Sequence, residues 1–314
     1  MKLLEQLELR LVDGGLRLIL KWLSRLAPER RMGGFGLILS WLSQLNSPHQ
    51  IAIVRSSLPL LDANGRLETL RSLLAEPQSN NNFNQDLDAV VNFSAYQRDA
   101  WVRMKAKMVK PGARVLDAGA GQCQYQGLFD HTNYKAQDFA QYVGSDQGPL
   151  WESWNYGKLD YICDITAIPV PDGSFDVVLC TEVLEHVPDP LSTIRELVRV
   201  LAPGGTLLIT APLGSGIHQE PHHYYGGFSP YFFRRVFGEL GVEPVAIKPL
   251  GGLLKHVAQE VARAGRTLAG SGELNAEAEH IVNQWLPQRL AELDDRYFVE
   301  QFTVGFLVEA RKNA

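Results

Sequence analysis

The feature that most constrains the fold is the run Val115 to Gly121, with the sequence VLDAGAG. Its apolar residues predict a buried strand that ends in an acid, Asp117, and then turns through two glycines into a helix. Glycine lets the backbone approach a ligand closely, and a helix N-terminus offers free N–H groups. A dinucleotide-binding turn would read G-x-G-x-x-G, but the last position counted from Gly119 is Gln124. The run therefore predicts a ligand-binding turn that need not hold a phosphate, for example one that receives an amino acid's carboxylate.

Strand and helix patterns alternate on both sides of this run. An apolar stripe from Leu191 to Leu201 predicts a helix ended by Pro203-Gly204-Gly205, and Ser229-Pro230 begins a second helix that stops at Gly241. Alternation at this spacing predicts a parallel, doubly wound sheet. A helical insertion at about 252–296 is followed by one more strand. The expected strands are 114–116, 134–137, 161–163, 175–180, 206–210 and 302–308.

Residues 1–80 form the first expected domain, a helical extension, and residues 81–314 form the second. The polar segment 77–86 reads as a linker between them. Residues 1–31 hold seven Lys or Arg and four acids, a local charge of +3. A basic amphipathic start can lie on an anionic membrane surface, and it can equally pack on its own domain or on a second subunit. We therefore expect peripheral membrane contact or homodimerisation through residues 1–45.

The composition of the chain indicates which classes of molecule it can bind and in which cellular compartment it works. Thirty Lys and Arg stand against 35 Asp and Glu, a net charge of −5. This charge disfavours nucleic acid as the main substrate, because phosphate binding needs a basic excess. The three cysteines form no CxxC pair, and the longest stretch without charged residues, 32–54, is diluted by polar residues. A spanning helix needs about 20 apolar residues, so we expect a cytoplasmic protein without a transmembrane segment.

Five ordered motifs over roughly residues 90–250 resemble those of class I S-adenosylmethionine-dependent methyltransferases, with the type 11 small-molecule group as the nearest match. The motifs are VLDAGAG, the acid Asp138, the pair Asp164-Ile165, the run TEVLEHV from Thr181, and LAPGG from Leu201. The resemblance implies a Rossmann-like α/β fold with a mostly parallel seven-stranded sheet, and S-adenosyl-L-methionine as cofactor. The cofactor-binding residues it implies are Asp117, Gly119, Ala120, Gly121, Asp138, Phe139, Asp164, Ile165, Thr181, Glu182 and Tyr96.

Within that resemblance, Asp138 would bind the ribose hydroxyls, and Asp164 would receive the adenine amino group. Alternatives remain at each acid: Asp117 as a helix cap, Asp138 as a solvated loop acid with Asp146 as its rival, and Asp164 as a plain turn residue. One departure is Cys123, which stands where a third glycine is frequent; its side chain is small, so cofactor binding should survive. Trp151, Trp154 and Tyr156 either wall the adenine pocket or serve as packing.

The acceptor site is expected in the segment His218 to Phe228, which follows the fifth strand and holds three histidines in six residues. Open α/β sheets bind ligands beyond the carboxyl ends of their strands. His222 is the preferred general base because Pro221 fixes the backbone before it, with His218 and His186 as further catalytic candidates. The same histidines could instead pack the loop, bond substrate or, for His218, His222 and His223, bind zinc. We expect no metal, because the loop is unlike H-E-x-x-H on a helix.

These observations predict an S-adenosylmethionine-dependent methyltransferase (EC 2.1.1.-), free of metal, that methylates an oxygen of a small molecule. A sugar, a lipid-linked intermediate or a secondary metabolite would be the acceptor, and S-adenosyl-L-homocysteine the product. The alternative is a module that binds the cofactor and regulates or scaffolds a partner without catalysis. A nicotinamide oxidoreductase is disfavoured by Gln124.

Overall fold

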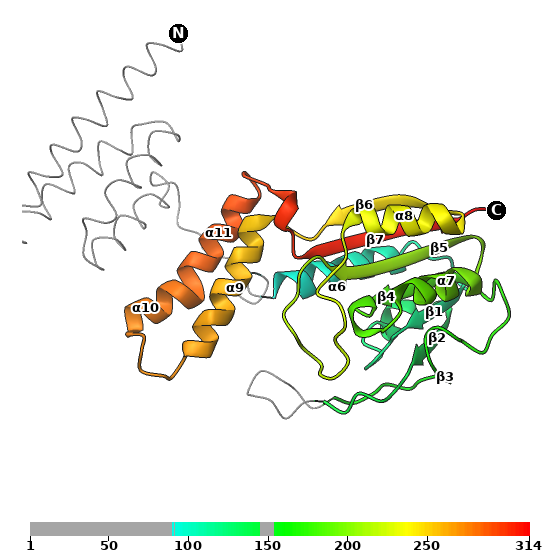
Figure 1. Cartoon of the computed structure of the whole chain (residues 1–314), viewed down its shortest axis with the longest axis horizontal. Helices are drawn as coiled ribbons and strands as arrows, with labels where there is room; N and C mark the ends of the chain where they lie inside the picture. Colours follow the sequence, from blue (N-terminus) through cyan, green and yellow to red (C-terminus); the bar gives the residue numbers. More distant parts are fainter. Residues whose placement is uncertain (1–89, 91, 145–153) are drawn as a thin grey trace, which may run out of the picture. The chain divides into compact units, whose positions relative to one another are not determined.

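The computed structural model describes residue 90 and residues 92–144 and 154–314. The expected extension 1–80, the linker, Asp146 and Trp151 lie outside the described residues. The described residues contain a seven-stranded sheet with the order β3-β2-β1-β4-β5-β7-β6 (Figure 1). Its strands are β1 Arg114–Ala118, β2 Asn133–Asp138, β3 Tyr161–Ile162, β4 Phe175–Thr181, β5 Leu201–Pro212, β6 Val242–Pro249 and β7 Gly305–Lys312.

Helices cover both faces of this sheet, and a further group of helices lies beyond one end of its strands (Figure 1). The α-helices are α6 Phe93–Ala106, α7 Pro190–Val200, α8 Pro230–Leu240, α9 Leu253–Leu268, α10 Ala276–His280 and α11 Leu286–Asp294. Short 3-10 helices lie at η2 Gln126–Phe129, η3 Leu184–His186 and η5 Glu300–Phe302, and a π-helix, η4, at Ile281–Trp285. No helix of the described residues is long and apolar enough to cross a bilayer.

The layers follow from the alternation of β4, whose successive side chains face opposite sides of the sheet. Val178 and Cys180 belong to the core formed with α7 and α8. Val177 and Leu179 belong to the core formed with α6 and η2. Because both faces are buried, β4 reads as a continuous apolar run, as parallel strands do.

The predicted doubly wound fold is confirmed. Strands β1 to β5 are parallel to one another, and β7 is antiparallel to both β5 and β6. The chain proceeds from β1 outward to β3 and then returns to β4 on the other side of β1. The carboxyl ends of β1 and β4 therefore meet at a topological switch point, the usual position of a ligand crevice in such sheets.

Two expectations about local structure are wrong, and one strand was not located from the sequence. No α-helix follows the glycine turn: the backbone makes turns from Gly121 to Tyr125 and then the short η2. The last strand begins at Gly305 rather than at Phe302, which ends the 3-10 helix η5. Strand β6 lacked an expected range because its two prolines weaken the strand pattern; they are tolerated at the sheet edge.

The helical insertion is confirmed as α9, α10, η4 and α11, which lie together beyond one end of the strands in Figure 1. Asp294, at the end of α11, fixes the start of α9. Its carboxylate accepts hydrogen bonds from the amides of Gly252 (2.8 Å) and Leu254 (3.0 Å). These amides are among the groups that a helix leaves without internal partners at its N-terminus.

Candidate active site

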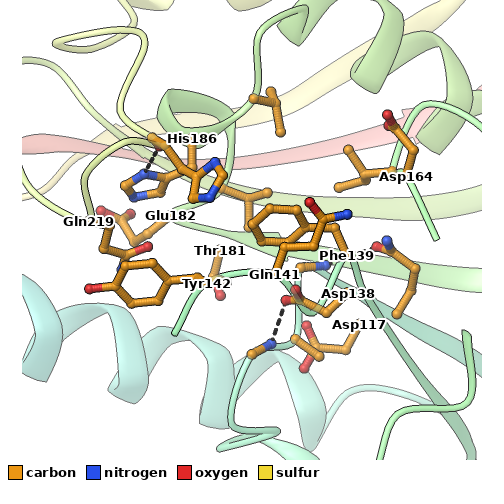
Figure 2. Close-up of a pocket in the computed structure, with 18 of the residues that line it drawn as sticks. Asp117, Asp138, Phe139, Gln141, Tyr142, Asp164, Thr181, Glu182, His186 and Gln219 are labelled. Carbon is orange, nitrogen blue, oxygen red and sulfur yellow. Dashed lines mark hydrogen bonds between the residues drawn. The ribbon is translucent and has the colours of Figure 1, made fainter. Parts of the chain in front are cut away.

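A cavity of about 760 Å³ opens where the carboxyl ends of β1 and β4 meet. This volume is within the usual range for sites that bind small molecules and cofactors. Figure 2 shows Asp117 and Asp138 close together, Asp164 to one side, and Glu182, Gln219 and His186 to the other. Of the eleven predicted cofactor residues, ten line this cavity: Asp117, Gly119, Ala120, Gly121, Asp138, Phe139, Asp164, Ile165, Thr181 and Glu182.

The exception is Tyr96. Its side chain is 61% exposed on α6 and does not line the cavity. Two residues further along the same helix, Arg98 does line it. The helical turn of about 100° per residue points positions two apart to different sides, so Tyr96 and Arg98 cannot share a face.

Asp117 is buried at the end of β1, where it accepts a hydrogen bond of 2.7 Å from the hydroxyl of Tyr134. Burial raises the pKa of Asp117 to about 7, although this hydrogen bond opposes the shift. Because no helix begins here, the interpretation of Asp117 as a helix cap is wrong. A buried carboxyl group at a cavity wall favours a cationic ligand, which would restore its charged form.

The glycine turn is shaped by close neighbours. A Cβ on Gly119 would lie 2.4 Å from Cγ2 of Val183, and one on Gly121 would lie 2.8 Å from the indole of Trp154. Both glycines have positive φ, 75° and 52°. Cys123 also adopts a left-handed conformation, with φ of 56°. The turn therefore needs glycine at two positions for both space and backbone conformation.

Asp138 supports the turn from the end of β2. Its Oδ2 accepts a hydrogen bond from the amide of Gly121 (2.9 Å), and its Oδ1 accepts one from the amide of Ala140 (3.0 Å). Each carboxylate oxygen has a second lone pair, so the group can bind ligand hydroxyls while it holds the turn. The side chain lines the cavity and is nearly buried.

Asp164 lies after β3, at the far side of the cavity. It forms an Asx turn, because its Oδ1 accepts hydrogen bonds from both the amide and the hydroxyl of Thr166, each at 2.8 Å. The turn role and a ligand role are compatible, since the side chain also lines the cavity beside the buried Ile165. Trp154 and Tyr156 line the cavity as well, and both pack edge-to-face within an aromatic group that includes Tyr142.

Arg98 is a lining residue that the sequence motifs do not single out. Its Nε donates to the hydroxyl of Tyr125 at 3.1 Å, and its Nη1 lies 4.0 Å from Oε2 of Glu182. Burial acts to lower the pKa of Arg98, but Glu182 and Tyr125 outweigh it and the pKa is raised. A fixed guanidinium at this position can bind a carboxylate of a ligand.

Glu182 adopts a left-handed conformation at the end of β4, with φ of 51°. Its Oε1 accepts a hydrogen bond of 2.6 Å from the hydroxyl of the buried Thr210 on β5. The strained backbone turns the chain sharply into η3, which carries Glu185 and His186. Such strain is characteristic of functional sites.

The predicted acceptor loop lies against η3. The amides of Tyr224 (2.8 Å) and Tyr225 (3.2 Å) both donate to the carbonyl of Glu185, and the hydroxyl of Tyr225 donates to the carbonyl of Pro188 (3.0 Å). Of the three predicted catalytic histidines, His222 and His186 line the cavity and His218 does not. His218 instead packs on His186, with ring centroids 4.7 Å apart.

The two lining histidines differ in their surroundings. His222 packs edge-to-face on Phe139, with ring centroids 5.0 Å apart. His186 has its Nδ1 2.7 Å from the carbonyl oxygen of His222 and its Nε2 3.7 Å from Oε1 of the buried Glu185. Burial lowers the pKa of His186 to about 4. His186 is therefore neutral at pH 7.

Comparison with known proteins agrees with this geometry. Residues 116–209 match the type 11 family model described as a methyltransferase domain. Over 116 residues the chain is 39% identical to a ubiquinone biosynthesis O-methyltransferase of Xanthomonas campestris, covering 33% of this chain and 45% of that enzyme. Over 144 residues it is 33% identical to an uncharacterized methyltransferase of a Mycobacterium strain, covering 43% and 54%. The matches thus span only about half the length of these relatives.

Solved structures resemble the chain more distantly. One is phosphoethanolamine N-methyltransferase 2 of Haemonchus contortus in complex with S-adenosyl-L-methionine, at 16% identity and a TM-score of 0.44. The resemblance covers 70% of this chain and 53% of that structure. The sheet order, the acid-lined cavity and the family match lead to one conclusion: residues 116–209 form a domain similar to the type 11 group of S-adenosyl-L-methionine-dependent methyltransferases.

Proposed function

We propose that this chain transfers the methyl group of S-adenosyl-L-methionine to an oxygen of a small-molecule acceptor. The observation that carries the proposal is the polarity of the cavity. Three aspartates line one part of it, and two histidines with Gln219 and Glu182 line another (Figure 2). A cofactor with hydroxyl, amine and sulfonium groups suits the first part, and a hydroxyl that must lose a proton suits the second.

On the cofactor side, Asp138 binds the ribose hydroxyls, and Asp164 with the amide of Ile165 binds adenine. The turn Gly119–Gly121 lets the backbone approach the methionine portion, whose carboxylate pairs with Arg98. Asp117, close by, offers a negative charge to the amino group. This assignment uses groups that already line one cavity.

On the acceptor side, His222 accepts the hydroxyl proton while the oxygen attacks the methyl carbon. The new O–C bond forms as the C–S bond breaks, and neutral S-adenosylhomocysteine leaves. The sulfonium is already reactive, so the chain mainly supplies orientation, which contributes roughly 7–11 kcal/mol in well-aligned reactions. A positioned base adds about 10²–10⁴-fold.

Oxygen as the acceptor atom is supported by the Xanthomonas relative, which is named an O-methyltransferase. The Haemonchus protein is named an N-methyltransferase, so amines belong in any test of the acceptor. The net charge of −5 favours a small molecule over a nucleic acid. Sugars, lipid-linked intermediates and secondary metabolites remain the acceptor classes that we propose.

The test is methyl transfer from labelled S-adenosyl-L-methionine to a panel of sugars, phenols, hydroxylated lipids and amines. We expect transfer to a hydroxyl compound. Replacement of His222 by Ala or Gln should lower kcat by about 10²-fold or more if it is the base, and should raise KM if it only orients the acceptor. His256→Ala is the matched control, because His256 lies on α9 and bonds the carbonyl of Phe302.

Cofactor binding without turnover on any panel member would support a regulatory or scaffold module instead. Transfer that is confined to amines would overturn the choice of oxygen. A His222 variant with unchanged kcat and KM would place proton acceptance elsewhere in the cavity.

A further inference from the structure

A cluster of potential metal ligands lies beside the acceptor side of the cavity. We propose that Glu185, His186 and His218 bind a divalent transition-metal ion. One carboxylate oxygen and one ring nitrogen from each histidine lie within 4.8 Å of one another. Glu185 and His186 come from η3, and His218 comes from the loop between β5 and α8, 32 residues further along the chain.

Glu185 is the first reason to expect a cation. Its side chain is 1% exposed, and its Oε2 has no hydrogen-bond partner among the described residues. Its Oε1 lies 3.7 Å from Nε2 of His186, beyond hydrogen-bond length. A buried carboxyl oxygen without a partner is costly in either protonation state. A bound cation at this position would remove the cost.

The two histidines are oriented as metal ligands usually are. Nδ1 of His186 lies 2.7 Å from the carbonyl oxygen of His222, and Nδ1 of His218 lies 2.9 Å from that of Gly216. A carbonyl oxygen can only accept, so each Nδ1 carries the proton and each Nε2 keeps its lone pair. Histidines that bind metals commonly donate their other ring N–H to a carbonyl or carboxylate in this way.

The ligand set selects the class of metal. Two imidazole nitrogens and one carboxylate suit Zn²⁺ or Fe²⁺, whereas Mg²⁺ and Ca²⁺ prefer oxygen ligands throughout. Zinc–nitrogen bonds of roughly 2.0–2.1 Å bring tetrahedral ligands to about 3.4 Å from one another, so His218 must move inward. It lies on a loop, only partly buried, whereas Glu185 and His186 are held in η3.

Three protein ligands leave at least one coordination position open, as in catalytic zinc sites. Because His186 also lines the cavity, a metal bound here lies at its wall. This inference departs from the expectation of a metal-free enzyme, and it does not depend on methyl transfer. The other zinc set expected from the sequence was His218 with His222 and His223, but the ring of His222 packs on Phe139 and Nε2 of His223 lies 3.2 Å from the hydroxyl of Ser215.

The experiment is equilibrium dialysis of the full chain against Zn²⁺, without cofactor or acceptor, followed by mass-spectrometric metal analysis. We expect one saturable equivalent per chain. His218→Ala and Glu185→Gln should each weaken binding at least about tenfold, since loss of outer-shell partners alone costs 10–100-fold in affinity. Co²⁺ in place of Zn²⁺ should show visible absorption bands that disappear in the same variants.

His256→Ala serves as the control and should bind Zn²⁺ as the unmodified chain does. His218→Ala keeps the test decisive should Glu185→Gln fail to fold, because His218 is only partly buried. Absence of saturable Zn²⁺ binding overturns the proposal, and so does binding that both substitutions leave unchanged. Titration with S-adenosylhomocysteine tests the methyltransferase proposal separately, so either proposal can fail alone.

Discussion

Replacement of the buried Asp117 by Asn should make the protein more stable at neutral and alkaline pH and a weaker cofactor binder. Burial raises the pKa of Asp117 from its ordinary 3.8 to about 7. Between these two values the folded state holds a proton that the unfolded state has released. The free energy of unfolding of the unmodified protein therefore falls as the pH rises through this window.

The size of the effect follows from the same shift. About 1.4 kcal/mol corresponds to one pH unit, so ionised Asp117 lowers the free energy of unfolding by up to about 4 kcal/mol at pH 8. Asn has nearly the same shape, carries no charge, and its amide oxygen can accept the hydrogen bond from Tyr134. The stability difference between Asp117→Asn and the unmodified chain should be small at pH 4 and approach this value at pH 8.

Urea unfolding at a series of pH values measures this difference, because the other titrating groups cancel between the two proteins. Asp176→Asn is the matched control, and its effect on the free energy of unfolding should change with pH in the opposite direction. The side-chain hydrogen bond from Arg114 lowers the pKa of Asp176, so that carboxylate stabilises the fold above its ordinary pKa and the effect is lost as the pH falls. Saturation with S-adenosylhomocysteine, which carries an ammonium group, should reduce the pH dependence that Asp117 causes. A stability difference for Asp117→Asn that stays constant from pH 4 to pH 8 would refute the reasoning.

Three further substitutions test the cofactor side by calorimetric titration with S-adenosylhomocysteine. Asp138→Ala should weaken binding about 10- to 150-fold, since hydrogen bonds to a charged group contribute roughly 1.5–3 kcal/mol; Asp160→Ala, which also removes a carboxylate that accepts a backbone amide, should not. Gly119→Ala should abolish binding because its Cβ would meet Val183, whereas Gly112→Ala, with a similar φ of 74° and open space around it, should only lower stability. Arg98→Met should weaken binding about tenfold or more through loss of a charged hydrogen bond, and Arg103→Met, exposed on the same helix, should leave it unchanged.

Most of the sheet could be predicted because its strands and motifs are local in the sequence. The apolar run of β4 and the Ser-Pro start of α8 each depend on a few neighbouring residues. The expected end of α7 at Pro203-Gly204-Gly205 is wrong, because α7 ends at Val200 and these residues lie within β5. The three acids of the cavity could be predicted for the same reason: Asp117 and Asp138 lie at the carboxyl ends of β1 and β2, Asp164 follows β3, and parallel strands end at one edge of the sheet. Strand β6 was missed because Pro244 and Pro249 disrupt its pattern, and edge position, which makes them tolerable, is not visible in the sequence.

Neither the role of Arg98 nor the acceptor side could be predicted from the sequence, because these residues are brought together only by the tertiary structure. Arg98 lies on α6, which carries none of the recognised sequence motifs, and only the packing of this helix brings Arg98 close to Glu182. His186 and His218 come together because the loop after β5 docks by backbone hydrogen bonds on η3, where the carbonyl of Glu185 receives the amides of Tyr224 and Tyr225. Backbone groups have the same chemistry at every non-proline residue, so the side-chain pattern of the sequence could not predict how this loop packs on η3. The three histidines of the loop predicted a functional site there, whereas only the structure shows that the buried Glu185 lies beside His186 and His218.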